Sequence, residues 1–298
     1  MSTYLPTLKQ LQYLVALHEH GHFGRAATAS YVSQSTLSAG IRELETLLGV
    51  TLVERSRRVV RFTPLGQEVI AKARLILREA EELTDLVQAA GKPLSGQLRM
   101  SVIPTIAPFL LPRILPRLRQ ERPELKLFLR EEPTDTALEN LAHGRVDCVL
   151  LALPYAIGDA ATASIGEDRL LVAFTPDEGR TPPDSIAPAG IDEGKLLMLE
   201  DGHCLKEHAL AAFNRPELRN GATMIGTSLH TLVQMVDNGL GITMLPQMAL
   251  DAGILDGTQV VARPLKAKNA SRDIALVWRK GSPREADFEL LAEEIRAG

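Results

Sequence analysis

Residues 67 to 90 contain neither proline nor glycine, and this run constrains the fold more than any other segment. Apolar residues recur in it every three or four positions with charges between them, which predicts one long amphipathic helix. The apolar positions are Val69, Ala73, Ile76, Leu77, Leu83, Leu86 and Val87. Such a seam is buried either against a partner helix or against the helix's own domain. The run Gly91-Lys92-Pro93-Leu94-Ser95-Gly96 then ends the helix, so we expect a domain on each side of it.

The segment before this helix has the pattern of a small helical domain. Apolar residues between Leu8 and Leu17 recur at helical spacing, and alanines at positions 26, 27 and 29 give the small face of a second helix. Ser33 is a suitable N-cap for a third helix, which stops at Gly49. The polar first turn of that third helix suits a recognition helix, whose N-terminal residues reach base edges in the major groove. Simple helix capping explains Ser33 equally well.

A cluster of arginines follows the predicted third helix. Arg55, Arg57, Arg58 and Arg61 alternate with apolar residues, which favours a two-stranded ribbon over a helix. Up to Arg61 the chain has seven basic residues against four acidic ones, although the whole protein carries a net charge of -4. An exposed basic ribbon can contact phosphates, and its alternative explanation is an ordinary solvated charge run.

Strand-like and helix-like runs alternate from Gln97 to the end of the chain. This rhythm predicts an α/β domain with a largely parallel sheet. The expected strands are 98–103, 125–129, 148–151, 170–174, 195–199, 242–245 and 273–278, and the expected helices lie after Pro104 and at 136–143, 205–213, 228–237 and 285–297. Ligands of such sheets collect at the carboxyl ends of strands, where Thr105, Thr134, Cys204 and Ser228 stand beside helix starts.

Cys204 is one of only two cysteines in 298 residues, and neither cysteine has metal-ligand spacing. It follows His203 at the predicted start of a helix, two features that favour the thiolate and therefore nucleophilic or oxidisable chemistry. The alternative is a small buried apolar residue. Cys148 lies in an apolar, strand-like run and is predicted to be such a core residue.

The chain start shows no basic and apolar signal segment, and no apolar run is long enough to span a bilayer, so we expect a cytoplasmic protein without membrane contact. His18, His20 and His22 do not have the spacing of a metal-binding helix, and neither a metal nor another cofactor is expected.

Residues 8 to 66 resemble the winged helix-turn-helix of LysR-type transcriptional regulators. The segments that carry the resemblance are 23–27, 32–38, 41–45, 48–50, 52–55 and 62–66. The resemblance implies that the recognition helix faces the groove and that the ribbon contacts phosphate or the minor groove. The implied groove residues are Ser33, Gln34, Ser35, Thr36, Ser38 and Arg42, and the implied ribbon contacts are Arg55, Arg57 and Arg58. Ser35 stands where proline is frequent, which a first helical turn tolerates. The resemblance also implies an antiparallel dimer through the linker helix.

Beyond the winged helix, the chain resembles the hydrogen-peroxide-responsive OxyR branch of this family essentially from end to end. The segments are 102–105, 147–153, 195–205, 241–246 and 281–283. The resemblance implies that Cys204 is the peroxide-reacting thiol and that Thr105, Thr134 and His203 belong to the peroxide pocket. Glu207 stands where that pocket usually has aspartate, and Phe213 stands where the branch usually has a second, resolving cysteine.

The sequence therefore predicts a winged helix-turn-helix in residues 1–66, a linker helix and hinge in 67–94, and a regulatory domain in 95–298. The regulatory domain is expected to be α/β and to resemble periplasmic binding proteins, with one subdomain formed by 95–166 and 270–298 and the other by 167–269. The predicted function is a promoter-binding transcriptional regulator that senses hydrogen peroxide through Cys204, with a homodimer or homotetramer and RNA polymerase as partners. The alternative is a regulator that binds a small effector in the cleft, with Ser228 among its contacts. A thiol peroxidase is disfavoured by the DNA-binding segment and by the lack of a second visible thiol.

Overall fold

A computed structural model describes residues 5–55, 60–88, 93–177, 181–214 and 225–297. The chain divides into two compact units, one built mainly from residues 1–90 and the other from residues 91–298 apart from 143–145. Each unit has its own hydrophobic core, and each is described by itself.

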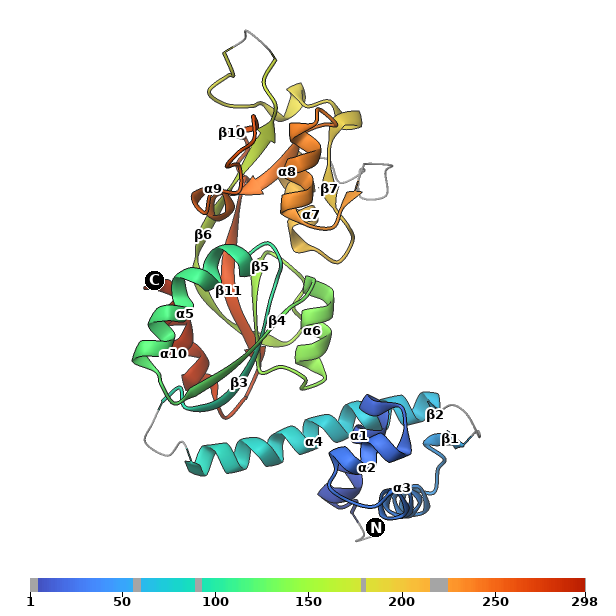
Figure 1. The fold of residues 1–298 in the computed structure, drawn as a ribbon. Helices are drawn as coiled ribbons and strands as arrows, with labels where there is room; N and C mark the ends of the chain where they lie inside the picture. Colours follow the sequence, from blue (N-terminus) through green and yellow to red (C-terminus); the bar gives the residue numbers. More distant parts are fainter. Residues whose placement is uncertain (1–4, 56–59, 89–92, 178–180, 215–224, 298) are drawn as a thin grey trace. The chain divides into compact units, whose positions relative to one another are not determined.

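The first unit is helical with a small two-stranded ribbon (Figure 1). Helix α1 begins in a capping box between Thr7 and Gln10, and α3 begins with Ser33 as its N-cap. Gly40 lets α3 pack closely on α1, because a Cβ at this position would lie 2.7 Å from the ring of Tyr13. The elements are α1 (Leu8–His20), α2 (Phe23–Ala29), α3 (Gln34–Leu48), β1 (Val53–Arg55), β2 (Val60–Phe62) and α4 (Pro64–Gln88).

The long helix α4 begins at Pro64, three residues before the predicted run, because proline fits the first turn of a helix. Part of its apolar seam packs into the core of its own unit, through Val69, Ala73 and Leu77. By contrast, Ile76 and Leu83 on the same helix are 49% and 65% exposed. The core of the unit therefore accounts for part of the seam, and a partner helix over the exposed positions stays a prediction. The side chains of Leu86 and Val87 lie outside the described residues.

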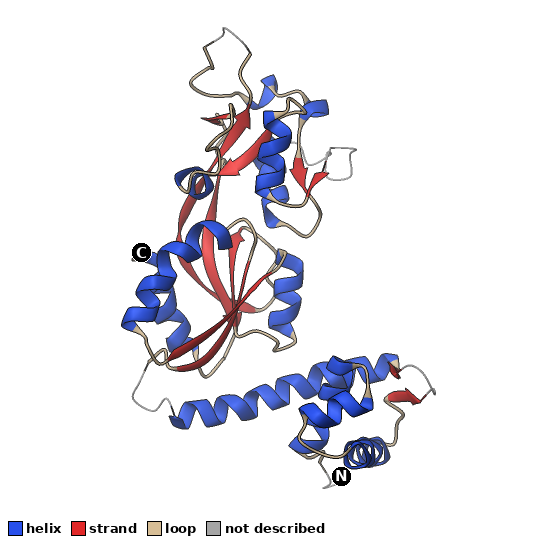
Figure 2. Cartoon of the chain, in the orientation of Figure 1, coloured by secondary structure: helices blue, strands red, loops and turns tan. Residues whose placement is uncertain are grey.

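The second unit is an α/β structure in which one long strand, β6, runs through both of its halves, and β11 pairs with the first part of it (Figure 1). Helices α5 and α10 cover one face of the larger sheet and α6 covers the other, and Figure 2 shows the alternation of strands and helices. The first half contains β3 (Gly96–Val102), α5 (Ala107–Glu121), β4 (Leu125–Glu131), α6 (Thr134–Ala142), β5 (Cys148–Leu153), β6 (Ala160–Phe174), β11 (Ser271–Arg279) and α10 (Glu285–Arg296). The second half contains two 3-10 turns (Pro188–Gly190 and Glu193–Lys195), β7 (Met198–Leu199), α7 (Cys204–Phe213), β8 (Ile225–Gly226), α8 (Leu229–Asp237), β9 (Thr243–Pro246), α9 (Gln247–Asp251) and β10 (Val261–Pro264).

The sheet order β10-β6-β11-β5-β3-β4 corrects the expectation of a largely parallel sheet. Strand β3 is parallel to β4 and β5, but β11 is antiparallel to both of its neighbours, β5 and β6. The reason is the return of the C-terminal strand to the first half, where it inserts between β5 and β6. The predicted strand 195–199 is also wrong in its first part, since residue 195 ends a 3-10 turn and only Met198–Leu199 is strand.

Two hydrophobic clusters divide the second unit. One surrounds β3, β5, β11, α5 and α10, and the other surrounds α7, α8, β9 and the end of β6. The exact subdomain limits at 166/167 and 269/270 stay a prediction. Within the described residues, no helix combines the length and apolarity needed to cross a bilayer, and no group of three or more His, Cys, Asp or Glu side chains could hold a metal ion.

Candidate functional site

Cys204 is the first residue of α7, and its side chain is buried. Its backbone N–H donates to the Thr134 hydroxyl at 3.2 Å, and Thr134 is itself the buried first residue of α6. One residue later, the Asp135 N–H donates to the Gly202 carbonyl at 3.4 Å. These two bonds join the N-terminal ends of α6 and α7, so the turn that carries Cys204 is fixed from both sides.

Burial raises the pKa of the Cys204 thiol above its ordinary value. The charge of Arg272 and hydrogen bonds from Thr134 and the backbone of Ala152 oppose this rise without cancelling it. Desolvation therefore outweighs the two features that were expected to favour the thiolate, the helix start and the neighbouring histidine. The raised pKa keeps Cys204 a neutral thiol at neutral pH, and Arg272, Thr134 and Ala152 offset part of the cost of placing negative charge on the sulfur.

Arg272 is the most buried cation of the site, and the sequence patterns did not identify it as a site residue. Its guanidinium contacts Asp168 through Nε at 3.0 Å and Nη2 at 2.9 Å. It also donates to the hydroxyl and the carbonyl of Thr105, at 2.8 and 2.9 Å. Asp168 accepts a further bond from the Met248 N–H at 3.0 Å. The predicted pocket residue Thr105 therefore accepts hydrogen bonds from the same cation whose charge lowers the pKa of Cys204.

His203 lies directly before α7 as its N-cap residue, but its ring makes no capping bond. It is buried, and burial lowers its pKa, an effect that Glu200 at 3.8 Å opposes. Glu207 lies in the first turn of α7 and is half-buried.

Ser228 caps α8 by accepting from the Thr231 N–H at 3.2 Å. Hydrogen bonds therefore join Thr134 to Cys204 and Thr105 to the neighbouring Arg272, whereas the Ser228 oxygen serves a helix cap.

Two further polar residues at the site were missed in the sequence. Tyr155 donates its hydroxyl to Asp135 at 2.5 Å, and burial together with this carboxylate raises the pKa of the phenol. His208 is buried with its Nε2 3.0 Å from the Pro154 carbonyl, and burial lowers its pKa to about 4. The sequence did contain a signal for His208, because residues four positions apart on a helix, such as Cys204 and His208, share one helix face.

Phe213 and Cys148 are both buried in apolar clusters of the second unit. Phe213 ends α7 and is buried in the apolar cluster of the second half. Both cysteines are free and buried. Cys148 begins β5, and Cys204 contacts the backbone of Ala152 on the same strand, about 13 Å along β5 from Cys148. No disulfide joins the two cysteines in this conformation.

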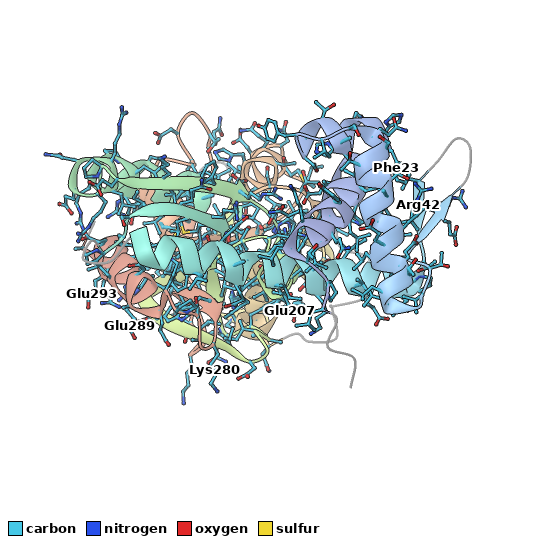
Figure 3. The ribbon with its side chains drawn as sticks, turned by 90° about the horizontal axis from the view of Figure 1, so that it is seen from below. Phe23, Arg42, Glu207, Lys280, Glu289 and Glu293 are labelled. Carbon is cyan, nitrogen blue, oxygen red and sulfur yellow. The ribbon has the colours of Figure 1, made fainter. Side chains whose placement is uncertain are left out.

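Most of the predicted DNA-contacting residues of the recognition helix are exposed in the first unit. Gln34, Ser35, Thr36 and Arg42 are exposed and Ser38 is half-buried, and Figure 3 labels Arg42 on α3. The Ser33 hydroxyl accepts from the Thr36 N–H at 3.1 Å, so its capping role is real.

The ribbon is held to α3 by Glu45, whose carboxylate accepts from the N–H groups of Leu52 at 2.8 Å and Val53 at 3.0 Å. Arg57, Arg58 and the side chain of Arg55 lie outside the described residues, so their phosphate contacts stay a prediction.

Comparisons with known proteins agree with both units. Residues 8–67 match the family described as bacterial regulatory helix-turn-helix protein, lysR family, and residues 91–298 match the LysR substrate binding domain. The chain is 41% identical over 291 residues to the DNA-binding transcriptional dual regulator OxyR of Escherichia coli, covering 97% of this chain and 95% of that protein. It is 40% identical over 293 residues to the HTH-type transcriptional regulator EstR of Acinetobacter baylyi, covering 98% and 97%. Full-length OxyR from Pseudomonas aeruginosa, solved as a cysteine-to-aspartate variant, aligns with a TM-score of 0.80 at 34% identity, covering 98% of this chain and 95% of that one.

Proposed function

Since this chain belongs to the LysR family of DNA-binding transcriptional regulators, we propose that it senses hydrogen peroxide through oxidation of Cys204 and changes transcription in response. The observation that carries the proposal is the set of groups around the sulfur. Thr134, Ala152 and the buried Arg272 all stabilise negative charge there. Relatives named as hydrogen peroxide-inducible genes activators match nearly the whole chain at up to 41% identity.

The chemistry follows from this arrangement. A thiol attacks peroxide as its thiolate, so the proton must leave the sulfur as the reaction begins. Negative charge then develops on the sulfur and on the departing hydroxide, and a preorganised cation stabilises that charge most when water is excluded. Arg272 meets this requirement because Asp168 and Thr105 fix its orientation. Burial of Cys204 also limits access to small oxidants.

The first unit would deliver the response to promoter DNA. We assign groove contacts to α3 through Gln34 and Arg42, and phosphate contacts to the ribbon arginines. The exposed Ile76 and Leu83 on α4 suit an antiparallel helix pair in a homodimer. Assembly of dimers into a tetramer, contact with RNA polymerase and residence in the cytoplasm complete the proposal. No catalytic turnover is part of it.

A peroxide pulse with dimedone as a sulfenic-acid trap tests this function, using the wild type, Cys204→Ser and Cys148→Ser. The two cysteines form a matched pair, because both are free and buried in the same unit. Intact-mass analysis should show one trapped adduct in the wild type and in Cys148→Ser, and none in Cys204→Ser. The DNA footprint should change with peroxide in the same two proteins. A peroxide response that survives in Cys204→Ser would refute the assignment.

One observation favours a second candidate, a regulator that responds to a small effector in the cleft. Phe213 stands in a buried apolar cluster where peroxide sensors of this branch usually have a second thiol. The relatives also include EstR, whose name mentions no peroxide. Thr105, Thr134, His203, Glu207 and Ser228 are the residues that such an effector would contact. This candidate predicts that Cys204→Ser keeps its transcriptional response to the effector.

A further inference from the structure

The Nδ1 atom of His208 is buried and has no hydrogen-bond partner among the described residues. A buried polar atom without a partner reduces stability, so its presence calls for an explanation. The other ring nitrogen, Nε2, lies 3.0 Å from the Pro154 carbonyl. A carbonyl only accepts, so Nε2 carries the proton and donates, and Nδ1 is left as a bare acceptor. Burial holds the pKa of this imidazole at about 4, which keeps the ring neutral at physiological pH.

His208 lies one helical turn after Cys204 on α7. The Cα–Cβ bond in a helix tilts toward the N-terminus, so the side chain at position i+4 lies over the residue at position i. Both residues also contact the same end of β5. Cys204 is bonded to the backbone of Ala152, and His208 to the carbonyl of Pro154, two residues further along. The bare acceptor and the thiol therefore share one helix face and one strand end.

The reduced thiol does not reach this acceptor, because Nδ1 has no partner within the described part of the chain, which includes Cys204. Oxidation lengthens the side chain of Cys204 by one sulfur–oxygen bond and puts a hydroxyl at its end. We propose that the sulfenic acid formed at Cys204 donates its O–H to Nδ1 of His208, and that this hydrogen bond retains the oxidised state in a chain that has Phe213 where a resolving cysteine would stand. The inference rests on the proposed peroxide function.

The proposed step balances with hydrogen peroxide as the oxidant. The sulfur attacks one peroxide oxygen, the O–O bond breaks and an S–O bond forms. The sulfur loses two electrons to the peroxide, and the leaving hydroxide takes the thiol proton and becomes water. The attached oxygen keeps its hydrogen, which points to Nδ1. Because the imidazole is a weak base, the proton stays on oxygen, and the sulfenic acid remains in the neutral form that reacts slowly with a second peroxide.

Substitutions at position 208 separate the two ring nitrogens. His208→Gln keeps a donor near the place of Nε2 and removes the Nδ1 acceptor. His208→Asn puts an amide oxygen near the place of Nδ1. His230→Gln is the control, because His230 lies on another helix, α8, where its ring stacks on Phe109. Each protein receives one peroxide pulse followed by catalase, and dimedone is added at increasing delays. Intact mass gives the sulfenic acid that remains, as a fraction of the thiol consumed.

His208→Gln should shorten the lifetime of the sulfenic acid by roughly tenfold, the factor expected from one ordinary hydrogen bond. The lost signal should reappear as the sulfinic acid. His208→Asn should restore part of the lifetime, and His230→Gln should match the wild type. Equal lifetimes in the wild type and His208→Gln would overturn the inference and leave the peroxide function intact. If the wild type forms no sulfenic acid at all, the proposed function fails and the inference fails with it. Should His208→Gln misfold, a lifetime in His208→Asn as short as that of free sulfenic acid would overturn the inference by itself.

Discussion

Replacing Arg272 with methionine is expected to destabilise the second unit by about 3–5 kcal/mol, because the change leaves a buried carboxylate without its cation. The side chain of Asp168 is 5% exposed and that of Arg272 is fully buried. Two bonds join the pair, at 3.0 and 2.9 Å, and two more join Arg272 to Thr105. A loss of this size is a large part of the 5–15 kcal/mol that stabilises an ordinary domain, so it should be easily measured.

Urea and thermal unfolding of the reduced protein measure this loss. A unit of about 200 residues shifts its Tm by roughly 2–4 °C per kcal/mol, so a drop of roughly 6–20 °C is expected. The double variant Asp168→Leu with Arg272→Met removes both charges and should recover at least ~1 kcal/mol relative to the sum of the single variants. Arg284→Met is the matched control, because Arg284 is also buried and paired, with Asp287 at 3.0 Å.

The same variants separate stability from peroxide chemistry. Arg272 lowers the pKa of the Cys204 thiol, so Arg272→Met should raise this pKa further and slow the reaction with peroxide at pH 7. Each unit of pKa lowers the thiolate fraction about tenfold. Arg284→Met should destabilise the unit and keep the peroxide rate of the wild type. Two results would refute the reasoning: a loss below ~1 kcal/mol in Arg272→Met, or an equal slowing of the peroxide reaction in Arg284→Met.

Three further predictions concern the recognition helix, the end of α7 and pH. Arg42→Ala should weaken operator binding by about 1–3 kcal/mol in a fluorescence anisotropy titration, and unchanged affinity would remove Arg42 from the interface. Phe213→Cys should destabilise the reduced protein by roughly 2–4 kcal/mol through the cavity left by the ring, and a peroxide-dependent disulfide in this variant, seen by intact mass, would require α7 to unwind. The pKa of His208 is about 4 in the folded chain, against 6.5 for an unperturbed histidine, so the unfolded state binds the proton first as the pH falls. The contribution of His208 to the free energy of unfolding should therefore be fully present above pH ~6.5, and up to about 3 kcal/mol of stability should be lost as the pH falls toward 4. Urea titrations at several pH values should show that His208→Gln lacks this part of the decline.

The sequence predicted the elements whose signals are local. The apolar spacing and capping residues of α1 and α3 determine where these helices begin, and Ser33 indeed accepts the N–H bond of a cap. The position of Cys204 at a helix start followed from the same kind of signal. These features depend on residues three or four positions apart, which a single sequence displays directly.

The electrostatics of the site depend on contacts that a single sequence does not display. Arg272 and Asp168 are 104 positions apart, and they lie directly opposite each other only because β11 pairs antiparallel with β6. That pairing went unpredicted, because the first residues of β6 are mostly small or polar and only its end, near 170–174, has an apolar pattern. The raised pKa of the thiol went unpredicted for a related reason. Burial by residues from several elements raises its pKa, and burial of this kind is a property of the assembled sheet.

The two ends of α7 limit what an oxidised Cys204 can do in this chain. The helix spans ten residues, so Cys204 and Phe213 lie about 14 Å apart, twice the distance that a disulfide allows between α-carbons. Phe213 also anchors the last turn in an apolar cluster, which makes unwinding costly. The first turn is held instead by polar contacts, from Thr134 to Cys204 and from Asp135 to Gly202. Polar contacts of this kind respond to a new hydroxyl on the sulfur, whereas an apolar anchor does not. Under the proposed function, the response to peroxide should therefore begin at the junction of α6 and α7, and hydrogen exchange should increase there on oxidation while the last turn of α7 stays protected.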